Sequence, residues 1–267
     1  MLRFAANISM MYLELPFLDR FAAAKSAGFD AVECWFPYEH SVGTLQAVLR
    51  ENDLTMVGIN SAAGSESEWG LAALPGRQED FARSAALAID YGQNLAVSGV
   101  HIMAGLTGSI SRATASATYL QNLEGTLKLA EGTGVQLLIE PLNSRDRPGY
   151  FLSTTEQAAQ IVARAGFEKL KIMFDCYHVQ IEQGDLLTRM CRHWSSIGHI
   201  QIAAVPDRTE PDHGEIDFIQ VCAEIERLGW PGWIGAEYRP RAGTAAGLGW
   251  RSRLTNGVEA VLAGRLN

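Results

Sequence analysis

The sequence predicts an α/β fold: a single (β/α)8 barrel, or TIM barrel, formed by residues 1–267 as one domain. Three observations favour it. Eight short apolar runs alternate with longer amphipathic runs from one end of the chain to the other. The length of 267 residues is typical of one such barrel, and no linker or low-complexity segment divides the chain. An open doubly wound sheet would be expected to carry a glycine-rich turn after its first strand, but residues 6–16 contain no glycine.

The eight predicted strands are mostly continuous apolar runs, as expected of parallel strands that are buried on both faces. Such strands form the inner wall of a barrel, with a helix after each one. They cover residues 2–8, 30–36, 54–60, 96–104, 135–141, 170–175, 198–203 and 233–238.

Amphipathic segments with helical spacing lie between the strands, and several end in glycine, a usual helix stop. Each would pack its apolar face against the outside of the barrel. The apolar faces are Phe17, Phe21 and Ala24 within 17–28; Leu120, Leu123, Leu127 and Ala130 within 119–134; and Phe218, Val221, Ile225 and Leu228 within 217–229.

Residues 60–80 form the least regular segment of the sequence. The segment is long for a connection between a strand and a helix. Loops of this kind often contribute to the active site of a barrel, but a plain surface excursion fits the sequence equally well.

Composition and charge narrow the class of protein. Hydrophobic residues make up 47% of the chain and charged residues 19%, which suits a large core and does not indicate disorder. The formal net charge of −8 argues against a nucleic-acid-binding protein, which needs a basic surface. The same net charge means that an anionic substrate needs a local cation.

Neither a secreted protein nor a membrane protein is expected. The N-terminus lacks the long apolar region and cleavage site of a signal peptide, and no apolar run approaches the roughly 20 residues that span a bilayer. The cysteines form no CxxC pair, so we expect free thiols and a cytoplasmic location. They are Cys34, Cys176, Cys191 and Cys222.

Polar residues end four consecutive predicted strands, from the fifth to the eighth. Catalytic groups of such barrels lie at these C-terminal strand ends, and neighbouring strands are about 4.8 Å apart. If the side chains point inward, three carboxylates and one amide oxygen converge and need a cation to balance them. Oxygen donors favour Mg²⁺ or Mn²⁺ over Zn²⁺. The four residues are Glu140, Asp175, Gln201 and Glu237.

Each of these residues also has a structural alternative. A single acid at a strand end is usually a helix N-cap or a salt-bridge partner, and a buried glutamine such as Gln201 often only satisfies backbone groups. Four such residues in consecutive strands are much harder to explain in this way. The pattern therefore predicts a divalent metal site.

Two further residues are candidates for substrate binding. His178 lies three residues beyond Asp175, where it could donate a hydrogen bond to a substrate oxygen or simply cap a helix. Arg208 lies on the loop after the seventh strand and suits a substrate carboxylate through a bidentate pair. His101 and His199 lie within predicted strands, so we expect core positions for both.

The chain as a whole resembles the hydroxypyruvate isomerase family, which includes the 2-oxo-tetronate isomerases and belongs to the xylose-isomerase-like barrels. The resemblance extends over nearly all of the sequence and does not depend on one short motif. The motifs that carry it are RFAANISMMY (3–12), FPYEH (36–40), LPGR (74–77), HIMAG (101–105), IEPLNSRDRPGYF (139–151), FDCYH (174–178), GHIQIA (198–203) and GWIGAEYRPRAGTAAGLGW (232–250).

The resemblance implies the same metal ligands that the strand ends indicate, with Glu140 and Glu237 as the catalytic pair. In related sugar epimerases the equivalents of His178 and Arg208 contact the substrate. Those epimerases carry a histidine ligand where this chain and the isomerase family have Gln201. The implied partner is a small sugar-acid substrate, and neither nucleic acid nor a membrane is expected. Barrels of this kind often associate, which leaves a homo-oligomer open.

The implied reaction is an aldose–ketose isomerisation of hydroxypyruvate to tartronate semialdehyde (2-hydroxy-3-oxopropanoate), assisted by Mg²⁺ or Mn²⁺. The alternatives are a 2-oxo-tetronate isomerase of the same family and a ketose 3-epimerase. An endonuclease-IV-like phosphodiesterase would need more histidines and a basic groove, and a mere binding protein would need no glutamate pair.

Two local features bear on the choice of substrate. The stretch 62–70 is shorter than the corresponding family loop, so specificity or loop closure can differ from the relatives. Residues 144–151 and 239–250 look more like the tetronate branch of the family.

Overall fold

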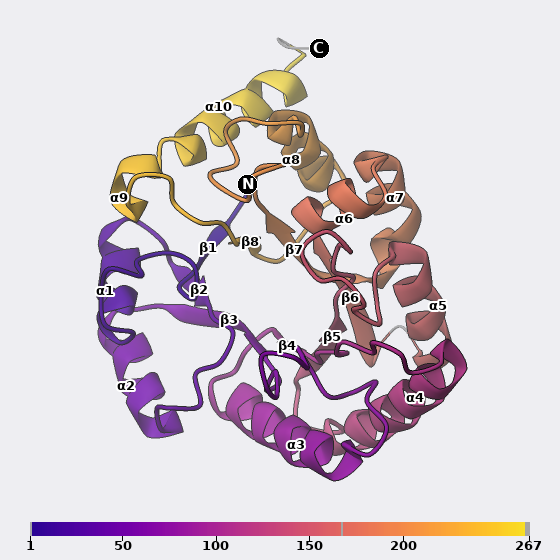
Figure 1. Ribbon diagram of the computed structural model, residues 1–267. Coiled ribbons are helices and arrows are strands. Elements are labelled where there is room, and N and C mark those ends of the chain that lie inside the picture. Colours follow the sequence, from indigo (N-terminus) through magenta and orange to yellow (C-terminus); the bar gives the residue numbers. More distant parts are fainter. Residues whose placement is uncertain (1, 167, 265–267) are drawn as a thin grey trace.

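Eight parallel strands pair in the order of the sequence, and the eighth pairs with the first to close the ring (Figure 1). The computed structural model describes residues 2–166 and 168–264. The closed (β/α)8 barrel predicted from the sequence is confirmed. The strands are β1 (Phe4–Asn7), β2 (Ala31–Glu33), β3 (Thr55–Asn60), β4 (Gly99–His101), β5 (Gln136–Ile139), β6 (Leu170–Asp175), β7 (Ile197–Ile202) and β8 (Ile234–Ala236).

The helices lie outside the strands and surround the barrel (Figure 1). All but α9 and the 3₁₀ turn bury apolar side chains in the core around the strands, which gives the barrel its outer core layer. They are α1 (Asp19–Ser26), α2 (Val42–Glu51), α3 (Gln78–Asn94), α4 (Arg112–Leu129), α5 (Thr155–Ala165), α6 (Cys176–Glu182), α7 (Leu186–His193), the 3₁₀ turn η1 (Trp194–Ser196), α8 (Phe218–Arg227), α9 (Thr244–Gly247) and α10 (Trp250–Leu262).

The helix expected within 119–134 differs from the prediction in its start and in its buried face. It begins at Arg112, because the Ser111 side chain accepts a hydrogen bond from the Thr114 backbone and caps the helix. Its buried face includes Tyr119, Asn122 and Leu123, whereas Leu120, Leu127 and Ala130 are only half-buried. Asn122 belongs to the buried face because its amide donates to the Ala72 carbonyl in the neighbouring loop.

The segment 60–80 packs against the end of the fourth strand. Gly70 forms an antiparallel bridge with Ala104, and the Ala73 backbone donates to the Ala104 carbonyl at 2.7 Å. The backbones approach so closely that a Cβ added at Gly70 would lie 2.5 Å from the Met103 carbonyl oxygen. This loop is therefore built onto the C-terminal end of the barrel.

Strand register decides which residues meet at that end. Asp175 is directly opposite Gln201 on β6 and β7, and Gln201 is directly opposite Gly235 on β8. Residues in register on parallel strands point to the same face, and so does a residue two positions further along a strand. The side chains of Asp175, Gln201 and Glu237 are thus directed into the barrel.

Two other expectations concern membranes and thiols. Within residues 2–166 and 168–264, none of the helices combines the length and apolar character needed to cross a bilayer. All four cysteines are free, as expected; Cys34, Cys176 and Cys222 are buried and Cys191 is exposed.

Candidate active site

A cavity of about 260 Å³ opens at the C-terminal ends of the strands. Glu140, His178, Arg208 and Glu237 line it, together with residues from the loops after β3 and β5. Gln201 lies beneath this cavity, where it borders a small void with Glu140 and Glu237. Glu140, Gln201 and Glu237 come from the strand ends that the sequence indicated, and Arg208 comes from the loop after β7, whereas the loop after β5 was not predicted to contribute.

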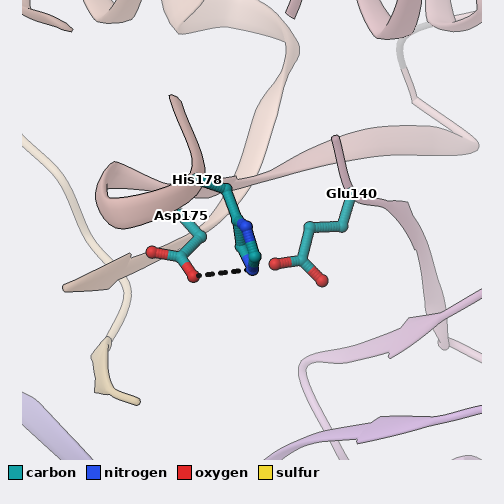
Figure 2. A group of neighbouring side chains, drawn as sticks. All are labelled: Glu140, Asp175 and His178. Atoms are coloured by element: carbon teal, nitrogen blue, oxygen red, sulfur yellow. Dashed lines mark ion pairs between the residues drawn. The ribbon is translucent and has the colours of Figure 1, made fainter. Parts of the chain in front are cut away.

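Glu140, Asp175 and His178 form a close cluster at the site (Figure 2). Each offers an oxygen or nitrogen atom, and these atoms all lie within 4.8 Å of one another. Asp175 is fully buried as the last residue of β6, and its Oδ1 accepts a hydrogen bond from the Tyr177 backbone, so it also caps α6. Asp175 is therefore both a helix N-cap, the structural alternative considered above, and a member of this cluster.

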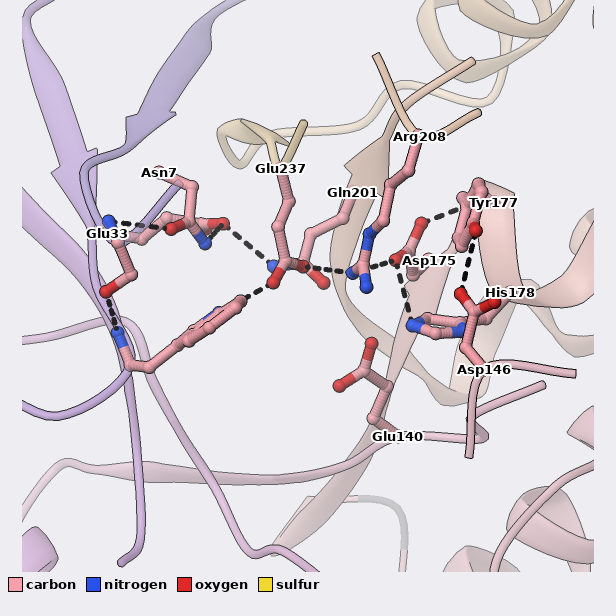
Figure 3. Close-up of polar contacts among 12 residues, drawn as sticks. Asn7, Glu33, Glu140, Asp146, Asp175, Tyr177, His178, Gln201, Arg208 and Glu237 are labelled. Atoms are coloured by element: carbon pink, nitrogen blue, oxygen red, sulfur yellow. Dashed lines mark hydrogen bonds and ion pairs between the residues drawn. The ribbon is translucent and has the colours of Figure 1, made fainter. Parts of the chain in front are cut away.

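Arg208 reaches into the cluster from the loop after β7, between two of the acids (Figure 3). Its Nη2 lies 3.2 Å from Asp175 Oδ2 and 3.4 Å from Glu237 Oε2. The guanidinium also lies over the Tyr177 ring. Arg208 thus balances part of the negative charge of the site, but Glu140 has no cation so close in the described residues.

The burial of three acids in one place shifts their pKa values upward. Burial raises the pKa of Glu140 well above its usual value, and the neighbouring Glu237 and Asp175 raise it further. Burial raises the pKa of Glu237 to about 8, although Arg208 opposes the shift. The pKa of Asp175 is raised in the same way by burial, against the opposing effect of Arg208. If all three acids were ionised, they would carry more negative charge than Arg208 alone compensates.

Hydrogen bonds fix the proton position on His178. The Asn143 backbone N–H donates to His178 Nδ1 at 3.1 Å, so Nδ1 is the acceptor nitrogen. Burial lowers the pKa of His178 well below its usual value, with Arg208 and Arg147 acting in the same direction, and the ring is neutral. Its proton is therefore on Nε2, which faces Asp175 and the cavity. This tautomer suits a hydrogen-bond donor to a substrate oxygen and does not suit a metal ligand at Nε2.

His101 and His199 are buried, as expected, but both take part in the site. His101 lines the cavity with Nδ1 3.4 Å from Glu140 Oε2, and burial lowers its pKa to about 3. His199 Nε2 lies 2.7 Å from Glu33 Oε2. Neither histidine is a plain core residue.

Glu33 is the acid that the sequence analysis missed. The predicted strand 30–36 placed it mid-strand, whereas β2 ends at Glu33 itself. The same signal that identified the other acids, a carboxylate at the end of an apolar strand, applies to it. Burial alone would raise the pKa of Glu33, but His199, Gln201 and Asn7 hold it below its usual value.

Glu33 orients the amide of Gln201. Gln201 Nε2 donates to Glu33 Oε1 at 2.8 Å, so Gln201 Oε1 faces the other way, toward the acids (Figure 3). The carboxylate also lies close to β8, because a Cβ added at Gly235 would be 2.6 Å from both of its oxygens. Trp35, just beyond Glu33, donates from Nε1 to Glu237 Oε1 at 2.7 Å.

The residues present fit a hard divalent cation. Glu140 Oε1 and Gln201 Oε1 are buried acceptors without a hydrogen-bond partner in the described part of the chain. Buried acceptors normally have a partner, and two of them beside an excess of carboxylates indicate a missing positive charge. Glu140, Asp175, Gln201 and Glu237 supply the oxygen donors that Mg²⁺ or Mn²⁺ prefers.

Changing Glu33 to glutamine is expected to weaken Mn²⁺ binding about 10- to 100-fold, as is usual for residues that orient a metal ligand. The NH₂ group of the introduced glutamine would face the NH₂ group of Gln201 or Asn7, and two donors cannot hydrogen-bond to each other. The Gln201 amide would then rotate, and its oxygen would no longer face the other acids. Calorimetric titration of the metal-free protein with Mn²⁺ measures the dissociation constant directly.

Gln201→Leu should produce a similar loss, and the double variant should lose little more, because both changes remove the same oxygen. Glu124→Gln, on an exposed part of α4, is the control. Independent, additive losses in the double variant would show that Glu33 does not act through Gln201.

Comparison with known proteins agrees with this geometry. A protein of Cupriavidus necator named 2-oxo-tetronate isomerase is 50% identical over 251 residues, which cover 93% of this chain and 96% of that protein. The hydroxypyruvate isomerase of Escherichia coli is 39% identical, with 94% and 98% covered. A crystal structure titled AP endonuclease, family 2, from Brucella melitensis matches with a TM-score of 0.92 and 37% identity, over 95% of this chain and 99% of that one.

The family assignment follows from the extent of these matches. Residues 21–254, most of the barrel, match the family described as xylose isomerase-like TIM barrel. The curated relatives cover nearly all of both chains and are named as isomerases. This chain therefore belongs to the xylose isomerase-like TIM barrel family, within the group that contains hydroxypyruvate isomerase and 2-oxo-tetronate isomerase.

Proposed function

We propose that the protein is an aldose–ketose isomerase that converts hydroxypyruvate to tartronate semialdehyde. The observation that carries the proposal is the pair of buried glutamates, Glu140 after β5 and Glu237 after β8, which line one cavity beside further oxygen donors. The named relatives support the same class of reaction. A 2-oxo-tetronate is the second candidate substrate, favoured by the 50% identity to a 2-oxo-tetronate isomerase.

Isomerisation moves a proton between two adjacent carbons, so the site needs a base at one carbon and an acid at the other. We assign these roles to Glu140 and Glu237, which approach the cavity from different walls of the barrel (Figure 3). The Trp35 hydrogen bond fixes the Glu237 carboxyl, so its other oxygen is left for the substrate and for Arg208. Which glutamate acts first as base depends on the direction of the reaction.

We assign the metal to Glu140, Asp175, Gln201 and Glu237, with Mg²⁺ or Mn²⁺ as the ion. When bound, the ion polarises the substrate carbonyl and holds the adjacent hydroxyl. His178 donates its Nε2 proton to a substrate oxygen, since Asn143 already occupies Nδ1. The sequence suggested Arg208 for the substrate carboxylate. We assign it instead to a substrate oxygen near the reacting carbons, because its guanidinium lies between Asp175 and Glu237.

The proposal also covers partners and location. The partner is a small sugar acid that fits a cavity of about 260 Å³, and the free thiols support a cytoplasmic location. A nucleic-acid partner is not proposed, because the chain carries a net charge of −8.

A substrate panel tests the proposed reaction. We expect the protein with Mg²⁺ or Mn²⁺ to turn over hydroxypyruvate or 2-oxo-tetronate at least about 100-fold more efficiently than free ketohexoses, because its named relatives are isomerases of these small acids. Product analysis by NMR distinguishes isomerisation from 3-epimerisation.

The panel includes a duplex with an abasic site, because one matching structure is titled an AP endonuclease. Cleavage of that duplex, or epimerisation of a ketose as the fastest reaction, would contradict the proposal. Fast turnover of 2-oxo-tetronate with little of hydroxypyruvate would instead select the second candidate.

A further inference from the structure

Arg147 is an arginine at the cavity that the assignments above leave without a role. It lies on the loop after β5, seven residues beyond Glu140, and lines the same cavity as Glu140 and Glu237. Its guanidinium lies 3.8 Å from the centroid of the Trp69 ring. Its Nη1 donates to the Asp146 carbonyl oxygen at 2.9 Å.

The charge of Arg147 is not matched by an acid. In residues 2–166 and 168–264 no carboxylate forms a salt bridge or a hydrogen bond with its guanidinium. The contrast with its neighbours is clear: Arg208 has Asp175 and Glu237, and Arg145 has Asp146. Partial burial lowers the pKa of Arg147, and the like charges of Arg208 and Arg239 lower it further, although the nearby Asp146 opposes the shift. Arg147 is therefore a cation of the cavity wall without an ion-pair partner among the described residues, in a protein of net charge −8.

The contact with Trp69 leaves Arg147 suited to an anion. A guanidinium that lies on an aromatic ring is held by its flat face, so the N–H groups at its edge stay free to donate. Those edges match the two oxygens of a carboxylate. The substrate proposed above carries a carboxylate directly on a reacting carbon, and the negative chain needs a local cation to hold it.

The chain fixes the ring beneath Arg147. The Glu68 carbonyl accepts a hydrogen bond from the Leu106 backbone, and the Glu68 side chain pairs with Arg77. The Trp69 ring also meets the Trp35 ring edge-on, at 6.4 Å between centroids. The loop after β3 thus presents Trp69 as a rigid support at the side of the cavity.

We propose that Arg147, supported on Trp69, binds the substrate carboxylate and so makes the site selective for sugar acids over neutral sugars. This inference rests on the proposed function, which it deepens by naming a specificity-determining residue. Arg208 differs from Arg147, because Asp175 and Glu237 already engage its Nη2. Arg147 acts on the end of the substrate that does not exchange protons.

The test compares Arg147→Met and Arg147→Lys with the wild type, all loaded with Mn²⁺. Losing a bidentate charged contact is expected to raise the KM for hydroxypyruvate about 10- to 100-fold, with kcat within about threefold, because the contact is made equally in ground and transition states. The lysine variant keeps the charge and should recover part of the loss. Arg251→Met is the matched control: Arg251 lies over Phe29 before β2, at the opposite end of the barrel.

Calorimetric titration with glycerate, an unreactive sugar acid, measures the affinity for a carboxylate without turnover. We expect the same 10- to 100-fold weakening in Arg147→Met and none in Arg251→Met. A KM and a glycerate affinity within twofold of wild type in Arg147→Met, or a fall in kcat without a rise in KM, would overturn the inference. If the wild type turns over neither acid, the proposed function fails, while the glycerate measurement still decides whether Arg147 binds a carboxylate.

Discussion

Replacing Glu140 or Glu237 by glutamine is expected to lower kcat at least about 100-fold, the usual cost of losing a general acid or base. Glutamine keeps the size of the side chain and one carbonyl oxygen, but it removes the negative charge and the ability to exchange a proton. The fold should survive, because Glu140 Oε1 has no hydrogen-bond partner in the described residues and a glutamine at position 237 can still accept the Trp35 hydrogen bond. Steady-state rates with hydroxypyruvate, together with thermal unfolding, measure the two effects separately.

The control for this pair is again Glu124→Gln, whose carboxylate is exposed and pairs only with Lys128 among the described residues. Each site variant should still bind glycerate, since the Arg147 contact remains. A variant that keeps more than about a tenth of the wild-type turnover would remove that glutamate from the proton-transfer role.

Removing divalent metal is expected to lower turnover about 1000-fold, because a bound cation supplies several kcal/mol of stabilisation to the developing negative charge. Arg208 is engaged with Asp175 and Glu237, and Glu140 has no cation comparably close in the described residues. Mg²⁺ or Mn²⁺ should restore the rate and raise Tm, and Zn²⁺ should do so poorly with an all-oxygen ligand set.

The test removes the metal by dialysis against a chelator and verifies its removal by elemental analysis. The turnover rate is then measured after each ion is added back. The Gln201→Leu variant should need a higher concentration of Mn²⁺ for half of its maximal rate. Full activity in protein that elemental analysis shows to be free of metal would contradict an obligatory ion.

The strand order and the position of the site could be predicted because both depend on short-range signals. A buried parallel strand appears in the sequence as a continuous apolar run, and an acid at its end is an exception to that pattern. Asp175 and Gln201 lie within the observed strands, while Glu140 and Glu237 follow theirs by one residue. Errors of a residue or two in the boundaries were therefore harmless for these four positions.

The same errors hid Glu33, which the prediction placed inside a strand that is in fact three residues long. The buried face of α4 was also missed, since Asn122 is buried by a hydrogen bond to a loop that periodicity does not describe. The position of Arg208 between two acids and the proton position on His178 depend on contacts between residues far apart in the sequence. Patterns along the chain carry no information on such contacts.

The absence of a side chain at Gly235 restricts which substitutions this sequence tolerates on β8. Even a methyl group at that position would occupy the space of the Glu33 carboxylate, which holds the Gln201 amide in place. A change to alanine on β8 therefore requires the Glu33 carboxylate to move, or a shorter side chain at that position on β2. Gly235 is thus constrained by Glu33, whereas Glu33 can change alone, and neither residue lines the main cavity.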